Sequence, residues 1–160
     1  MIIDITSLKS NIVSKIEICE SLSVDENLLN DSKILDLKET IVEGTIIKDN
    51  LDEYIIDVNV KGTMVLEDSI TLDPIDYDFE THIEGNIDEL LEEINLISKK
   101  TEFSIDIFPI IWENILMEVP IRCTNGENIK IEGNGWKFVS EEETSSSTNP
   151  EFEKLKDLFK

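Results

Sequence analysis

Positive charge is scarce in this sequence. Its 160 residues include 14 lysines and arginines against 36 aspartates and glutamates, for a formal net charge of −22 at pH 7. Arg122 is the only arginine, and no basic residue except His82 occurs between Lys61 and Lys99. Proteins that bind nucleic acids neutralise phosphates with lysine and arginine. The composition therefore argues against direct RNA binding through charge. It indicates either a basic protein as partner or a charge that serves solubility alone.

Cysteine and histidine are also rare. Cys19 and Cys123 are too few and too far apart for a disulfide framework, and His82 is the only histidine. The sequence has no zinc-binding cluster, no EF-hand loop and no phosphate-binding glycine loop. An enzyme would need His82, a cysteine or a carboxylate pair in a deep pocket. We therefore expect no catalysis, cofactor, metal or small-molecule substrate.

Long apolar runs are missing too. No stretch approaches the ~20 apolar residues that span a bilayer, and the first residues lack the basic region of a signal peptide. The composition, 40% hydrophobic and 31% charged, is typical of a globular protein. We expect a cytoplasmic protein without a membrane contact.

Alternating apolar and polar residues predict a mainly antiparallel sheet. The alternation is clearest in 39–48 and 54–66, which flank a turn-rich segment and should pair as a hairpin. Gly44 and Gly62 lie inside these strand patterns, which indicates bulges or a bend. A sheet built this way should curve, and it could close like a barrel.

The segment 75–83 predicts a further strand with two unlike faces. One face is apolar, and the other carries the carboxylates of Asp76, Asp78 and Glu80. The plain interpretation is a solvated sheet face. The functional interpretation is that the carboxylates attract a basic partner.

Helical spacing of apolar residues occurs in 25–35, 87–97 and 106–119. The last of these is the most apolar, with Pro109 tolerable in its first turn and Pro120 at its end. We expect it to form one long amphipathic helix that packs on the apolar face of the sheet. The predicted fold class is therefore α+β, in a domain comprising residues 1–139.

The last residues differ from this domain. Residues 140–149 contain no apolar side chain and predict a flexible linker. Residues 150–160 predict a short amphipathic helix, for which Asn149 and Pro150 form a suitable start. A helix this short is marginal alone. Its apolar side chains should dock either on the chain's own domain or on a partner: Phe152, Leu155, Leu158 and Phe159.

Three segments carry short motifs in a recognisable order: Val-Glu-Gly at 42–44, Lys-Gly-Thr-Met-Val-Leu at 61–66, and an apolar stretch with Glu-Asn and a closing proline at 106–122. In this order they resemble motifs of the YceD family, the bacterial large ribosomal RNA subunit accumulation proteins. Residues 106–122 are similar to its most recognisable stretch, which has a Glu-Asn pair, two leucines and a closing proline. Residues 42–44 and 61–66 resemble its V-x-G and G-x-x-x-L strands. Residues 133–136 and 149–151 resemble the low-GC Gram-positive branch. The similarity spans nearly the whole chain.

The chain also departs from the family pattern. The family usually has C-x-R-x-L after the G-x-x-x-L strand, whereas this chain has residues 68–72 without the cysteine or the arginine. Glu151 stands where an arginine is usual, and the cysteine-rich segment of some members is missing. A role that depends on a thiol, a metal or that arginine therefore does not carry over.

The resemblance implies a non-enzymatic role in the accumulation or maturation of large-subunit (23S) ribosomal RNA. It also implies a link to a small basic ribosomal protein, because the family is commonly encoded beside one. Combined with the charge, it suggests binding of a basic large-subunit ribosomal protein or of a pre-ribosomal particle. The candidate binding residues outside the tail are Asp76, Asp78, Glu80, Trp112, Glu113 and Asn114. The alternative is an acidic interaction module or nucleic-acid mimic unrelated to the ribosome.

Overall fold

The computed structural model describes two compact units, Met1–Thr124 and Asn125–Lys160. The residues that it describes are 1–94, 103–125, 132–133 and 136–137. In the second unit these form a two-stranded antiparallel hairpin, β7 (Glu132–Gly133) and β8 (Trp136–Lys137). The predicted linker 140–149 and the predicted tail helix lie outside the described residues.

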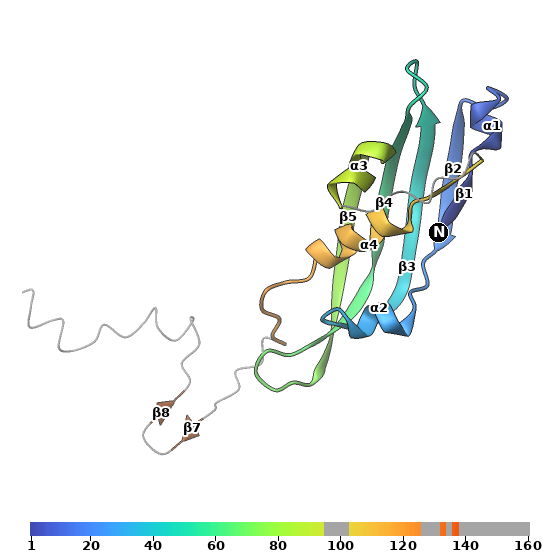
Figure 1. The fold of residues 1–160 in the computed structure, drawn as a ribbon. Coiled ribbons are helices and arrows are strands. Elements are labelled where there is room, and N and C mark those ends of the chain that lie inside the picture. The colour runs from blue at the N-terminus through green and yellow to red at the C-terminus, as the bar shows by residue number, and fades with distance from the viewer. Residues whose placement is uncertain (95–102, 126–131, 134–135, 138–160) are drawn as a thin grey trace, which may run out of the picture. The chain divides into compact units, whose positions relative to one another are not determined.

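A four-stranded antiparallel sheet forms the first unit (Figure 1). Its strand order is β2 (Lys15–Ser21), β3 (Ile34–Lys48), β4 (Tyr54–Glu67) and β5 (Pro74–Asn86). Asp49 closes the turn between β3 and β4, because its Oδ1 accepts hydrogen bonds from Leu51 N at 2.7 Å and Glu53 N at 3.1 Å. The predicted hairpin and the predicted α+β class are both confirmed.

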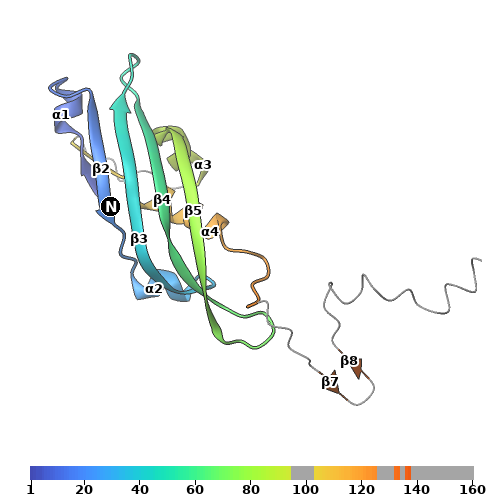
Figure 2. The same ribbon diagram turned by 180° about the vertical axis from the view of Figure 1, so that it is seen from behind.

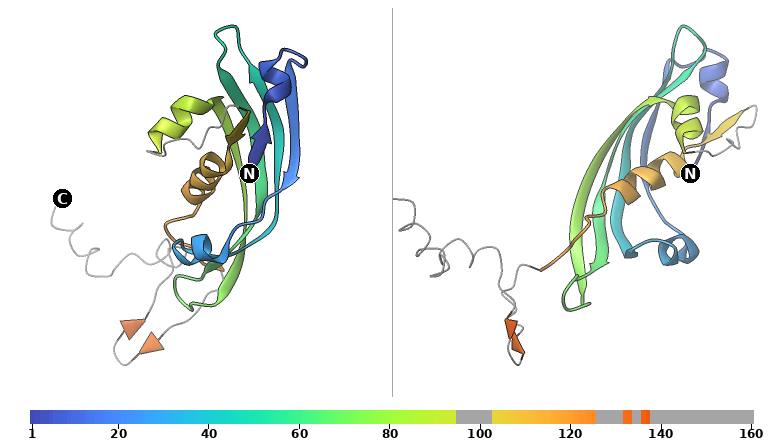
Figure 3. Two further views of the ribbon diagram at one scale, coloured as in Figure 1. Left: turned by 45° about the vertical axis from the view of Figure 1, so that its right-hand side comes forward. Right: turned by 60° about the vertical axis from the view of Figure 1, so that its left-hand side comes forward.

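The sheet curves but does not close. Figure 3 shows it bent around one side, with β2 and β5 as its two edges. Among the described residues these edges do not pair with each other. The expectation that the sheet could close like a barrel is therefore wrong.

The helices are short, and the two that cover the sheet lie on its concave side (Figure 3). These are α3 (Ile87–Glu93) and α4 (Phe108–Met117). The other two, α1 (Thr6–Lys9) and α2 (Glu26–Asn30), each comprise little more than one turn. In the described part of the chain, no helix has the length and apolar character needed to cross a membrane.

The prediction of one long helix over 106–119 is wrong, because the helix comprises only Phe108–Met117 and Asp106 belongs to a strand. β6 (Ser104–Asp106) pairs antiparallel with β1 (Ile2–Asp4). Asp106 then separates strand from helix, since its Oδ1 accepts hydrogen bonds from the Met1 ammonium and from Phe108 N, both at 3.1 Å. The helix that remains has ten residues and keeps the predicted proline in its first turn.

The predicted helix over 25–35 is also shorter than expected. It ends at Asn30, and Leu35 lies in β3 with 49% of its surface exposed. From Ile34 onward the chain pairs with β4 as a strand, although the spacing of its leucines is helical. Local periodicity is a weaker determinant of structure than a long strand partner.

The core lies between the concave side of the sheet and α4. Apolar residues of β4 alternate into it, and α4 contributes one face; the buried side chains include Ile56, Val58, Val60, Met64, Ile111 and Ile115. Each such side chain contributes roughly 1.5–3 kcal/mol by leaving water. This core fixes the register of the sheet and thereby determines which residues face outward.

Two register shifts interrupt the pairing of β3 with β4, one between Ile34 and Asp36 and a second one next to Gly62. The register shifts between Lys38 and Ile41, so that Glu39 and Thr40 lie opposite Gly62 alone. Glu39 has a φ of 47°, in the left-handed region. A Cβ on Gly62 would lie 2.6 Å from Thr40 Oγ1, which explains the glycine. A bulge near Gly62 was predicted, and the structure shows that β3 is the bulged strand.

Gly44 marks a close approach of two backbones and not a bulge. A Cβ there would lie 2.2 Å from the carbonyl oxygen of Asp57 and 2.5 Å from the Cα of Val58. The residue lies in an unbroken stretch of the β3–β4 register. Glycine is therefore required for close packing at this position.

Candidate functional site

The convex face of the sheet carries the predicted acidic residues. Asp76, Asp78 and Glu80 alternate along β5 and are exposed, whereas Phe79 is buried. Figure 2 shows this face without a helix over the four strands. The predicted division of the strand into an apolar and a solvated face is confirmed, because the sheet is covered on one side only.

Cross-strand pairing extends the acidic face beyond the predicted residues. Glu84 continues the alternation on β5, and Asp57 of β4 lies directly opposite it. Both are exposed. We name the exposed carboxylates on the outward side of β4 and β5 the acidic face: Asp57, Asp76, Asp78, Glu80 and Glu84.

Lysines neutralise part of the convex side. Lys61 Nζ lies 3.2 Å from Glu43 Oε2, and Lys15 Nζ lies 2.6 Å from Glu17 Oε1. The hydrogen bond from Lys15 lowers the pKa of Glu17. These exposed pairs add little stability, because water screens them. They reduce the attraction of β2 and β3 for a cation.

Two lysines lie at the acidic face itself: Lys61 of β4 is the cross-strand neighbour of Glu80, and Lys38 contacts Asp76. Lys38 Nζ donates to Asp76 Oδ1 at 2.7 Å, and this hydrogen bond raises the pKa of Lys38. Asp78 has a neutral partner, since its Oδ1 accepts a hydrogen bond from Thr63 Oγ1 at 2.7 Å. Among the described residues, Asp78 therefore forms no ion pair with a lysine.

His82 lies among these carboxylates. Its Nδ1 is 2.8 Å from Asn59 Oδ1, and its Nε2 is 3.9 Å from Asp57 Oδ1 and 3.7 Å from Glu84 Oε2. Cys19 occupies the same row of the sheet but on β2, three strands away. At ~4.8 Å per strand, the thiol and the imidazole are too far apart to act as a catalytic pair.

A hollow of about 480 Å³ opens on the convex side over the bulge. Gly62 and Thr63 form its floor, and the exposed Glu39, which has a left-handed backbone, stands at its rim. The charged residues of the lining are three carboxylates and one amine: Glu39, Asp78, Glu80 and Lys61. The hollow could therefore receive a basic side chain. A guanidinium suits it best, because its planar donors can bind two carboxylates at once.

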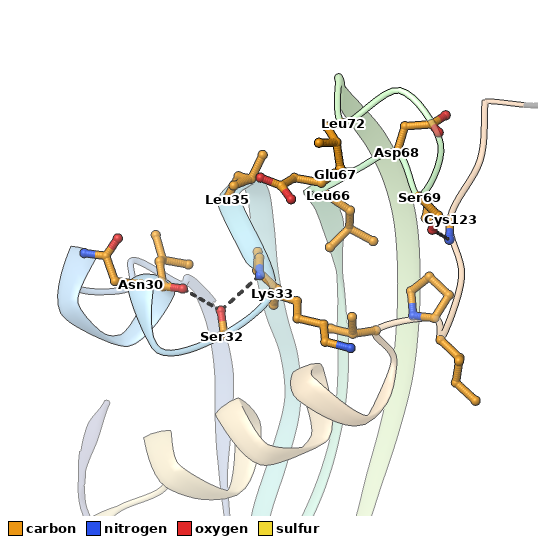
Figure 4. Close-up of a pocket in the computed structure, with 15 residues that line it drawn as sticks. Asn30, Ser32, Lys33, Leu35, Leu66, Glu67, Asp68, Ser69, Leu72 and Cys123 are labelled. Atoms are coloured by element: carbon orange, nitrogen blue, oxygen red, sulfur yellow. Dashed lines mark hydrogen bonds between the residues drawn. The ribbon is translucent and has the colours of Figure 1, made fainter.

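A second cavity of about 510 Å³ lies at the end of the sheet where β4 finishes (Figure 4). Leu35, Leu72 and Ile121 border it and are largely exposed. Ser69 fixes the opposite wall, because its backbone N donates to Cys123 O at 2.8 Å and its Oγ accepts from Cys123 N at 3.1 Å.

One wall of this second cavity is the loop in which the sequence departs from the YceD pattern. Asp68 begins that loop and is buried, and its Oδ1 accepts hydrogen bonds from Ile70 N at 2.7 Å and Thr71 N at 3.1 Å. The carboxylate thus shapes the turn from within. Among the described residues, no group of three or more His, Cys, Asp or Glu side chains could hold a metal ion.

The predicted residues of α4 lie on the other side of the sheet from the acidic face. Trp112 is 9% exposed and stacks on Phe108 at a ring distance of 6.4 Å, so it belongs to the core. Asn114 Nδ2 donates to the carbonyl of Ile110 at 2.9 Å, and Glu113 is exposed. The structure therefore does not bring these residues together with the β5 carboxylates. Phe152, Leu155, Leu158 and Phe159 lie outside the described residues.

Sequence reasoning missed three acidic residues of the convex side. Glu84 continues the alternation that predicted its neighbours, so the pattern could have included it. Asp57 and Glu39 depend on the pairing register and on the bulge. The alternation of 54–66 places Asp57 on the solvated face, but its position beside Glu84 and the outward position of Glu39 cannot be derived from one strand's own sequence.

Comparison with known proteins gives one distant relative and no fold match. No family model matches the chain. The chain is 29% identical over 117 residues to the uncharacterized protein YlbN of Bacillus subtilis strain 168, which covers 65% of this chain and 65% of that protein. No solved structure is similar. Because YlbN is uncharacterized, the likeness supplies no activity.

Proposed function

We propose that this chain is a non-enzymatic factor in large ribosomal subunit biogenesis. In this proposal it is a member of the YceD family and supports accumulation or maturation of 23S ribosomal RNA by binding a basic ribosomal protein. The ribosomal role is supported by the resemblance of residues 106–122, 42–44 and 61–66. The binding mechanism is supported by the acidic face.

The observation that carries the mechanism is the charge of β5. Between Pro74 and Asn86 this strand holds four outward carboxylates and no lysine or arginine. Within the part of the chain that the structure describes, Asp76 alone of the four forms an ion pair with a lysine, although Lys61 lies opposite Glu80. In water such a surface attracts cationic polypeptides and speeds their encounter, and it repels phosphodiesters.

The physical benefit of such binding follows from the chemistry of ribosomal proteins as a class. A strongly basic chain binds any nucleic acid through its lysines and arginines, regardless of sequence. A carboxylate surface competes with phosphate for the same side chains. An acidic carrier would therefore keep a basic protein from unspecific RNA contacts until its assembly site is available.

The first test measures which proteins the chain captures. Tagged protein should recover basic large-subunit ribosomal proteins from a bacterial lysate at low salt, and recovery should fall several-fold at high salt. The double variant Asp78→Asn/Glu80→Gln should recover less at low salt. The matched control, Glu17→Gln/Glu20→Gln on β2, should recover as much as the unaltered protein.

The second test measures the role in the cell. Depletion of the protein should lower the large-subunit peak and the amount of 23S RNA in sucrose gradients. Unchanged subunit profiles would contradict the proposed role. Recovery of a nuclease or polymerase in place of ribosomal proteins would favour the nucleic-acid mimic, in which alternate carboxylates, ~6.8 Å apart on a strand, imitate phosphates.

A further inference from the structure

The outer edge of β5 is open. β5 pairs with β4 on one side, and in the described part of the chain no strand pairs with its other side. Within the same residues, the backbone groups of 75–85 form no hydrogen bonds to turns, loops or caps. Among the described residues, β5 is therefore an edge strand of thirteen residues whose outer backbone groups have no strand partner. Such an edge is a template for another extended chain.

The two sides of this edge differ in chemistry. On the convex side it presents the carboxylates of Asp78, Glu80 and Glu84. On the concave side, Ile75 and Tyr77 are only half-buried, although the residues further along the strand are buried. An added strand with alternating basic and apolar side chains would match both sides at once.

The charges also decide against a second copy of this chain. Two β5 edges paired with each other would place carboxylates opposite carboxylates, which is destabilising. The same residues that block self-association select a cationic strand. The β2 edge lacks this preference, because it is seven residues long and its Lys15 and Glu17 neutralise each other.

We propose that the outer edge of β5 binds an extended cationic segment as an additional antiparallel or parallel strand. Main-chain hydrogen bonds would supply affinity, and the alternating carboxylates would supply the preference for lysine or arginine at every second position. This inference rests on the proposed function for one point only, that the natural segment is a basic extension of a ribosomal protein.

The test uses the full chain and a synthetic peptide of about ten residues with alternating lysine and valine. Amide hydrogen exchange is measured by NMR with and without the peptide. The backbone amides on the outer edge of β5, which point away from β4, should exchange about tenfold or more slowly when the peptide binds, because they gain hydrogen bonds. The amides of β2 serve as the internal control and should not change.

A second peptide separates backbone pairing from charge attraction. It has the same sequence, but alternate backbone nitrogens on the pairing edge are methylated and cannot donate. It should bind about tenfold more weakly, because it keeps its charges but cannot donate backbone hydrogen bonds to β5. Equal binding of both peptides, binding without slower exchange in β5, or no binding at all would overturn the inference.

The variant Asp78→Asn/Glu80→Gln/Glu84→Gln should weaken binding of the unmethylated peptide by about tenfold at low salt. At high salt the variant should lose less affinity, because salt screens the charges that it removes.

Failure of the proposed function can be told apart from failure of this inference. If lysates yield no ribosomal protein while the peptide still protects β5, only the proposed partner is wrong. If ribosomal proteins bind and the β5 amides stay unprotected, only the edge is wrong.

Discussion

The two faces of the four-stranded sheet follow different physical rules. On the concave face, β4 and α4 bury apolar side chains completely, as at Ile56 and Ile115. On the convex face, β4 and β5 expose carboxylates, and none of the described helices covers this face (Figure 2). Changes on the concave face should therefore alter the free energy of unfolding, and changes on the convex face should alter binding. Each prediction below tests this separation.

The largest effect is expected at Trp112. Trp112→Ala removes a buried ring that stacks on Phe108 and should lower the free energy of unfolding by about 3–5 kcal/mol. Urea unfolding measures it. The matched control is Glu113→Ala on the exposed side of the same helix, which should change stability by less than ~0.5 kcal/mol. Equal losses in the two variants would mean that α4 does not pack through Trp112.

A smaller loss is expected at Gly44. Gly44→Ala places a methyl group 2.2 Å from a backbone oxygen of β4, so the strands must separate. The free energy of unfolding should fall by about 1–3 kcal/mol. The neighbouring variant Thr45→Ala, in the same part of the register, should cost less. If Gly44→Ala is neutral in thermal unfolding, the backbones are further apart than described.

Glu39 is the exception on the convex side, because its backbone and not its side chain should affect stability. Glu39→Gly relieves a left-handed backbone that costs ~1–2 kcal/mol, although glycine also raises the entropy of the unfolded chain. The free energy of unfolding should rise by up to about 1 kcal/mol. Glu39→Ala keeps the strain and should give no gain. Loss of stability in the glycine variant would contradict a left-handed bulge residue.

The smallest effect is expected at Lys38, where stability should hardly change and binding should improve. Lys38→Gln frees Asp76 from its 2.7 Å ion pair and adds one unneutralised carboxylate to the acidic face. Affinity for the lysine–valine peptide should rise about two- to threefold at low salt. Isothermal titration calorimetry measures it. A decrease in affinity would show that Lys38 and not Asp76 contacts the peptide.

The strands could be predicted further than the helices. Alternation located β5 and the hairpin of β3 and β4, because a sheet covered on one side imposes a period of two on its sequence. The helix over 106–119 was predicted too long. Asp106 belongs to β6, which pairs with β1 a hundred positions away, and no local pattern indicates such a pairing. Trp112 was named as a binding candidate, although the helical stripe to which it belongs was itself expected to pack on the sheet. Its burial depends on what α4 packs against.

The sequence by itself determined the excess of carboxylates, their alternation on 75–83 and the apolar faces that must be buried. These properties belong to single segments, because side-chain periodicity is a local consequence of backbone geometry. Only the tertiary structure determined that Asp57 lies beside Glu84, that a bulge hollows the convex side, and that the sheet stays open at β5. These features depend on pairing between distant strands, and the physical reason is register: one residue of slip would turn every carboxylate into the core.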